Sequence, residues 1–177
     1  MSRLAAFFIV LALLSGCSPQ KPAPDIAREK TAIEAAITGF ENAYQTKDGG
    51  AMKKLFSQSD DIAWFGTDSA EVIKGWAQWE KQMNDDWQVF ESIRMGTPRN
   101  LSILVDNDAQ MASAIFESPV DVTMAGQSPH MLFRFGSTLR KENGEWRFVQ
   151  GTVAVASVGQ SSAEMAAKMK DSQGMKK

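Results

Sequence analysis

The side chains that could carry out acid–base chemistry are few in this 177-residue chain. They comprise three close aspartate pairs, one histidine and one tyrosine: Asp60–Asp61, Asp85–Asp86, Asp106–Asp108, His130 and Tyr44. A general acid and a general base need two carboxyl groups whose surroundings push their pKa values apart. The three pairs fall at expected helix ends and turns, which aspartate favours. We therefore interpret them as solvated capping and turn residues.

The surroundings of His130 and Tyr44 lead to different predictions. His130 lies in the expected loop Gln127–His130, and no neighbour in the sequence supplies a carboxylate or carbonyl to hold its tautomer. We interpret it as a loop histidine. Tyr44 lies on the apolar stripe of an expected helix, where a buried hydroxyl needs a hydrogen-bond partner. It is a candidate to line a pocket.

Asp121 and Arg134 both lie inside expected strands, where a charge must face water or be paired in a pocket. By alternation Arg134 points to the opposite face from Phe133 and Phe135. On a pocket face it could clamp a carboxylate or enolate. On the outer face it is a solvated charge, which we favour because strand arginines are usually exposed.

Several classes of function leave no trace in the sequence. One histidine and one cysteine leave only carboxylates as metal ligands, and these lack EF-hand or zinc spacing, so we predict neither a metal nor a cofactor. No glycine-rich phosphate-binding motif or Gly-x-Ser-x-Gly motif occurs. The net charge of −2 and the absence of a basic patch argue against nucleic acid as a partner.

The first 16 residues are typical of a secretory signal peptide. Arg3 precedes the apolar run Leu4–Leu14, which is too short to span a bilayer. The run ends in Leu14-Ser15-Gly16-Cys17, which resembles the bacterial lipobox. This resemblance implies cleavage after residue 16 and a lipid such as palmitate on Cys17. The alternative is a chance cysteine at the end of an ordinary signal peptide.

Lipidation of Cys17 would anchor the protein to the bacterial cell envelope, with the membrane as its partner. Ser18 resembles the residue found there in outer-membrane lipoproteins, which implies a domain that faces the periplasm. Residues 17–25 contain three prolines in the segment SPQKPAP and predict an extended tether. The export compartment permits disulfides, but the lone cysteine forms none within the chain.

Two helices are predicted directly after the tether. Asp25 is the expected N-cap of a long amphipathic helix whose apolar residues follow at helical spacing: Ile26, Ile33, Ile37, Phe40 and Tyr44. Residues 48–50, Asp-Gly-Gly, are expected to end it, and residues 52–56 predict a short second helix.

A third helix begins at Gly75-Trp76 and places Trp76, Trp79, Met83 and Trp87 on one face. Together with Trp64 from a short strand, these side chains could floor a cavity for an apolar ligand. Plain core packing is the alternative and is the more usual meaning of such a stripe.

From Val89 onward the apolar period changes to two, which predicts antiparallel strands. We expect them at residues 89–96, 100–106, 109–118, 120–125 and in a hairpin over 131–157, after two short strands at 62–65 and about 72–73. Turn residues separate them, including Ser118-Pro119 and the hairpin turn Glu142-Asn143-Gly144. Helices followed by antiparallel strands predict one α+β domain over residues 26–158. Residues 159–177 are expected to form a mobile polar tail with at most a short helix at 162–170.

Alternation along the second hairpin strand predicts which side chains face the interior. Trp146, Phe148, Gln150, Thr152 and Ala154 fall on one face. We expect Phe148, Gln150 and Thr152 of this face to line a pocket. Val149, Val153 and Val155 fall on the other, which we expect to be the outer surface of the sheet.

The order of elements and the segment Arg140-Lys141-Glu142-Asn143-Gly144-Glu145-Trp146-Arg147-Phe148-Val149 resemble the SnoaL-like branch of the nuclear transport factor 2-like superfamily. The resemblance covers residues 26–157. It implies a cone-shaped, curved antiparallel sheet wrapped around the long first helix, with two shorter helices and a pocket between them. The superfamily includes isomerases and dehydratases, and also non-enzymatic binding and dimerising domains.

Many SnoaL-like members resemble Trp-Arg-hydrophobic-Val-His-x-His-x-Ser, with both histidines facing the pocket. In this chain Gln150 and Thr152 occupy the histidine positions. These side chains form hydrogen bonds but cannot shuttle protons near neutral pH, so the difference favours binding over catalysis.

Three hypotheses follow from the sequence. The first is a lipid-anchored domain that binds a small apolar or amphipathic molecule without catalysis, in a pocket lined by Tyr44, Trp64, Trp79, Met83, Phe148, Gln150 and Thr152. The second is an interaction module that forms a homodimer or docks a partner through Val149, Val153 and Val155 on the outer face. The third is an isomerase- or dehydratase-type enzyme that uses Tyr44 or Asp121.

Overall fold

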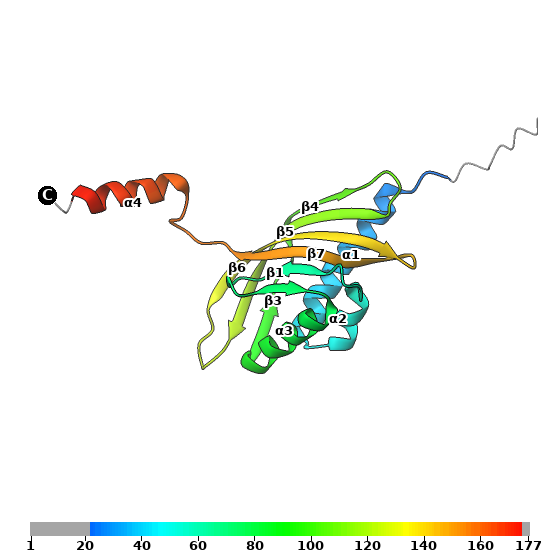
Figure 1. Ribbon diagram of the computed structural model, residues 1–177, viewed down its shortest axis with the longest axis horizontal. Coiled ribbons are helices and arrows are strands. Elements are labelled where there is room, and N and C mark those ends of the chain that lie inside the picture. Colours follow the sequence, from blue (N-terminus) through cyan, green and yellow to red (C-terminus); the bar gives the residue numbers. More distant parts are fainter. Residues whose placement is uncertain (1–21, 175–177) are drawn as a thin grey trace, which may run out of the picture.

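The computed structural model describes residues 22–174 (Figure 1). The expected signal peptide, Cys17 and the first part of the tether lie outside these residues, as does the end of the tail. The helices are α1 (Ile26–Gln45), α2 (Gly49–Leu55), α3 (Trp76–Val89) and α4 (Ser162–Gly174). The strands are β1 (Ala63–Phe65), β2 (Val72–Lys74), β3 (Ser92–Met95), β4 (Arg99–Val105), β5 (Met111–Thr123), β6 (His130–Glu142) and β7 (Glu145–Val155).

The strands form one curved, seven-stranded sheet with the order β2-β1-β7-β6-β5-β3, in which β4 also pairs with β5. β3 and β4 lie along successive halves of the same edge of β5. Adjacent strands are antiparallel except β1, which runs parallel to β7. The predicted α+β class and the sheet curved around the first helix are confirmed.

Aspartate side chains cap the first turns of α1 and α2. The Asp25 carboxyl accepts a hydrogen bond from the backbone N–H of Arg28 at 3.1 Å, as an N-cap should. The predicted end of α1 is partly wrong, because Asp48 caps α2 through the Ala51 N–H and the two following glycines belong to that helix. The α1 stripe then packs into the sheet: Phe40 contacts Phe135 of β6 and Phe148 of β7.

The turn expected at Ser118-Pro119 does not exist, because β5 continues through it. The Pro119 carbonyl accepts a hydrogen bond from Gly96 N–H on the β3 side. In a strand the N–H and C=O of one residue point to the same side, so the missing proline N–H faces the β3–β4 connection. No neighbouring strand needs a backbone N–H from residue 119 at this point, so β5 tolerates the proline.

A β-bulge in β7 corrects the predicted faces of that strand. Leu139 of β6 pairs with Phe148 and Thr138 pairs with Gln150, so Val149 is an extra residue in β7. One inserted residue reverses every later side chain. Trp146 and Phe148 point inward as predicted, but beyond the bulge Gln150 and Thr152 are exposed.

The bulge also overturns the predicted outer surface. Val153 and Val155 point toward the interior, and Val149 is 5% exposed. The three valines therefore do not form the outer surface predicted for them, and homodimer formation itself stays a prediction. Gly151 lies between Gln150 and Thr152 on the inward face, where an added Cβ would lie 2.4 Å from the Trp64 ring.

The tail contains a longer helix than expected. α4 covers Ser162–Gly174, and it stands apart from the sheet in Figure 1. No helix among residues 22–174 has the length and apolar character needed to cross a membrane.

Candidate functional site

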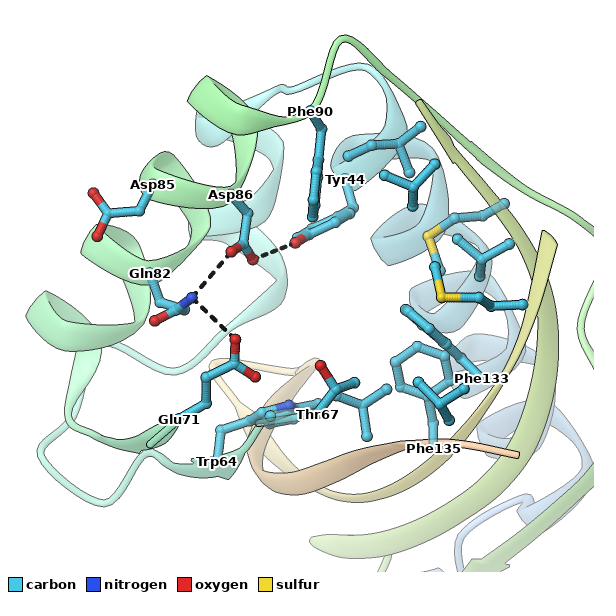
Figure 2. Close-up of a pocket in the computed structure, with 18 of the residues that line it drawn as sticks. Tyr44, Trp64, Thr67, Glu71, Gln82, Asp85, Asp86, Phe90, Phe133 and Phe135 are labelled. Carbon is cyan, nitrogen blue, oxygen red and sulfur yellow. Dashed lines mark hydrogen bonds between the residues drawn. The ribbon is translucent and has the colours of Figure 1, made fainter. Parts of the chain in front are cut away.

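A cavity of about 430 Å³ lies between the sheet, α1 and α3 (Figure 2). Its volume falls within the range of natural ligand pockets. Apolar side chains from β3, β5, β6 and β7 form most of its wall, and they are Ile93, Met95, Val120, Val122, Met131, Phe133, Phe135, Val153 and Val155. The wall can therefore accommodate an apolar ligand.

The polar groups of the cavity gather on the opposite side, on α1, α3 and the segment before β2. The Tyr44 hydroxyl donates to Asp86 Oδ2 at 2.7 Å, and Gln82 Nε2 donates to Asp86 Oδ1 at 3.0 Å. Gln82 Nε2 also lies 3.5 Å from Glu71 Oε1. Figure 2 shows these four side chains as one chain of hydrogen bonds beside the apolar wall.

Local structure explains how this polar cluster forms. Gln82 and Asp86 are one helical turn apart on α3, so they share a face. Tyr44 lies in the last turn of α1, and Trp87 Nε1 donates to its carbonyl at 3.1 Å, which joins the two helices. Lys47 Nζ adds a 2.7 Å hydrogen bond to the Trp87 carbonyl. These contacts fix the distance between Tyr44 and Asp86.

Burial governs the protonation of the Tyr44–Asp86 pair. Burial, followed by the Asp86 charge, raises the pKa of Tyr44 well above its ordinary value. Burial also raises the pKa of Asp86, and the hydrogen bonds from Tyr44 and Gln82 oppose this shift. Tyr44 thus stays protonated and donates, while Asp86 accepts.

Glu71 reaches the cavity because residue 66 is glycine. A Cβ at Gly66 would lie 1.9 Å from Glu71 Oε2 and 2.6 Å from Glu71 Cβ. The same Oε2 accepts the backbone N–H of Asp68 at 3.0 Å. The Glu71 side chain is therefore held across the β1–β2 connection, with its other oxygen toward Gln82.

Of the seven side chains predicted to line the pocket, Tyr44, Trp64 and Trp79 do so. Met83 and Phe148 are each 1% exposed and belong to the core. The aromatic stripe therefore contributes some side chains to the cavity wall and others to plain core packing. Gln150 and Thr152 lie on the outer face because of the bulge. The missing histidines at these positions therefore no longer argue against catalysis.

Sequence reasoning missed Asp86, Gln82 and Glu71 as site residues. Asp86 was interpreted as a solvated cap, yet it follows Trp79 and Met83 at steps of seven and three, which places it on the same helical face. That spacing could have identified it. Its neighbour Asp85 is also among the lining residues, but its carboxyl forms an ion pair with Lys81 and takes no part in the hydrogen bonds of the cluster.

The other charged candidates lie on the outer face of the sheet. His130 Nδ1 is 2.6 Å from Asp121 Oδ1, so the carboxylate that the local sequence did not supply comes from the neighbouring strand. Both side chains are largely exposed and neither lines the cavity. Arg134 is 62% exposed and pairs with Glu117, which agrees with the favoured interpretation.

Two of the aspartate pairs have structural partners. Asp106 accepts the backbone N–H groups of Gln110 and Met111 in a turn, and Asp61 pairs with Arg140. Among residues 22–174, no group of three or more histidine, cysteine or acidic side chains is arranged to hold a metal ion.

Comparison with known proteins identifies the family of this chain. The family described as the SnoaL-like domain matches residues 33–157. The chain belongs to this family. No curated protein matches the chain.

Solved structures resemble this SnoaL-like domain in fold. A nuclear transport factor 2-like superfamily protein from Salmonella enterica serovar Typhimurium has a TM-score of 0.69 at 19% identity, over 78% of this chain and 99% of its own. Hexachlorocyclohexane dehydrochlorinase LinA-type3 from Novosphingobium barchaimii has a TM-score of 0.65 at 15% identity, over 75% and 89%. A protein with a cystatin-like fold from Caulobacter vibrioides has a TM-score of 0.62 at 16% identity, over 74% and 92%.

Proposed function

We propose that this SnoaL-like domain binds a small, mostly apolar molecule in the cavity, with one polar group of that molecule against Tyr44, Gln82 and Asp86. The observation that carries the proposal is the division of the cavity into an extensive apolar wall and one compact polar cluster. Apolar pockets with a few convergent polar groups are typical ligand sites.

The neutral dye N-phenyl-1-naphthylamine tests the proposal through the rise of its fluorescence in an apolar site. Wild-type protein should bind it saturably. Val153→Phe should weaken binding by about tenfold or more, because the larger ring occupies the cavity opposite α3.

Thr152→Phe is the matched control, since it adds a ring to the adjacent residue on the outer face. It should leave dye binding within about twofold of wild type. Circular dichroism would show that both variants are folded. Equal binding by the two variants would place the dye elsewhere and refute the proposed site.

A second candidate function is acid–base catalysis of the isomerase or dehydratase type. The buried Tyr44–Asp86 hydrogen bond favours it, because a tyrosine donor beside a carboxylate can polarise a carbonyl while the carboxylate accepts a proton. The fold of the dehydrochlorinase is compatible with such chemistry. Exchange of a bound ketone's α-hydrogens in D₂O by wild type, and not by Asp86→Asn, would favour catalysis over binding alone.

We further propose that Cys17 carries a lipid that anchors the domain to the cell envelope, with the domain in the periplasm. The proposal is supported by the segment Leu14-Ser15-Gly16-Cys17 after an apolar run. In a bacterial host, labelled palmitate should enter the wild-type protein and not Cys17→Ser. The Cys17→Ser protein should also leave the membrane fraction, because it lacks the acyl chains. Retention of label in Cys17→Ser would contradict the assignment.

A further inference from the structure

Glu71 and Asp86 face the cavity without a cationic partner. No Lys, Arg or His lines the cavity, and neither carboxyl takes part in an ion pair among residues 22–174. Lys81 is engaged with Asp85, and Lys47 with backbone carbonyls at the end of α3. Both carboxyl groups are half-buried, and a carboxylate partly removed from water favours a cationic partner, so this cluster has an unmatched negative charge.

The two carboxyl groups converge on one point. Both contact Nε2 of Gln82, at 3.0 Å from Asp86 and 3.5 Å from Glu71. The Asp68 backbone N–H and the space left by Gly66 hold Glu71, while Tyr44 holds Asp86. The Gln82 amide occupies the point between the two carboxyl groups, so a further donor would approach both of them from the cavity side.

The surroundings of the cluster also suit a positive charge. Tyr44, Trp64, Trp79 and Phe90 line the cavity with aromatic rings, and the faces of such rings attract cations. Trp79 is 6% exposed, and its indole N–H has no hydrogen-bond partner among the described residues. An N–H donor pairs with an acceptor and not with an ammonium, so it is the aromatic rings that favour a cation here.

We propose that the ligand of this cavity is an amphipathic amine, whose ammonium group lies between Glu71 and Asp86 and whose apolar body lies against Phe133 and Phe135. This inference rests on the proposed binding function and specifies the chemical class of the ligand. A carboxylate ligand is disfavoured at this cluster, because the two carboxyl groups would repel its charge, and the Tyr44 and Gln82 donors of the cluster are already engaged.

Three compounds with one apolar body and different head groups test the inference: 4-phenylbutylamine, 4-phenylbutanol and 4-phenylbutanoate. Calorimetric titration of the full-length protein should show the amine binding about tenfold more tightly than the alcohol, because charged hydrogen bonds are stronger than neutral ones. The carboxylate should bind most weakly. Equal affinities for amine and alcohol, or tighter binding of the carboxylate, would overturn the inference.

Variants that remove one negative charge show which carboxyl groups cause the preference for the amine. Asp86→Asn and Glu71→Gln should each lower amine affinity by about fivefold to tenfold and leave alcohol affinity within about threefold. Glu80→Gln is the matched control, since it removes one charge from an exposed position of α3 outside the cavity. If Glu80→Gln lost as much amine affinity, the preference for the amine would come from long-range electrostatic attraction. That result would refute the proposed contact with Glu71 and Asp86.

The outcomes separate the two proposals. Binding of the alcohol and the dye without preference for the amine would refute the amine assignment and leave the binding function intact. Failure of all three compounds and of the dye would refute both.

Discussion

Replacement of Gly151 by alanine should lower the free energy of unfolding by about 3 kcal/mol, because the added methyl group has no space in the core. The new Cβ would lie 2.4 Å from Trp64 Cζ3 and 2.8 Å from the Gly136 carbonyl oxygen. Trp64 cannot move aside easily, because it is 3% exposed and packs against Phe56 and Trp79. Urea denaturation followed by tryptophan fluorescence measures the change.

Gly136→Ala is the matched control on the neighbouring strand. Its Cβ would meet only Thr152 Cγ2 at 3.6 Å, an ordinary contact distance. We expect a change within about 1 kcal/mol, since alanine fits an extended strand without strain. Similar losses in the two alanine variants would mean that the close approach of Trp64 to β7 is not what requires glycine at position 151.

Glu41→Gln should remove a pH-dependent loss of stability. Glu41 of α1 is 5% exposed, and its carboxyl accepts a hydrogen bond from Ser118 of β5. Burial raises the pKa of Glu41 from its ordinary 4.5 to about 6, and the Ser118 hydrogen bond offsets only part of this shift. The folded state therefore disfavours the ionised carboxyl more than the unfolded state does.

Proton linkage determines whether ionisation of Glu41 raises or lowers the stability of the folded state. Below pH 4.5 the carboxyl is protonated in both states, so the stability contribution is fully present. As the pH rises through about 6, the contribution is lost, and the loss amounts to about 2 kcal/mol for a shift of this size. Wild type should thus lose about 2 kcal/mol more than Glu41→Gln between pH 4.5 and pH 7.

Urea unfolding at four pH values across this range provides the measurement. Glu34→Gln serves as the control, because Glu34 is exposed on the same helix. Its stability should follow the wild-type pH profile. Parallel profiles for wild type and Glu41→Gln would show that Glu41 does not titrate as a buried carboxyl.

Local sequence patterns predicted much of the scaffold, because the interactions that carry them lie within a few residues. The Asp25 cap, the stripe of α1 and the hairpin turn at Asn143-Gly144 depend on neighbours in the chain. Asn143 and Gly144 both adopt positive φ, as a two-residue hairpin turn requires. The sequence therefore locates these features without reference to any tertiary contact.

The cavity depends on contacts between distant segments. Tyr44 and Asp86 are 42 residues apart, and their hydrogen bond exists only because α1 and α3 pack side by side. Likewise His130 meets Asp121 only through the pairing of β5 and β6. No local pattern encodes such pairings, so sequence reasoning assigned Asp86 to solvent and left His130 without a partner.

The sequence by itself determined the α+β class, the SnoaL-like resemblance, the order of the elements and the apolar stripe that seats α1. Tertiary structure decided which side chains join Tyr44, Trp64 and Trp79 in the site. The extra residue at Val149 reverses the faces of β7, so Val153 and not Thr152 reaches the cavity. Strand alternation assigns faces only while the register is unbroken, and the register depends on the partner strand.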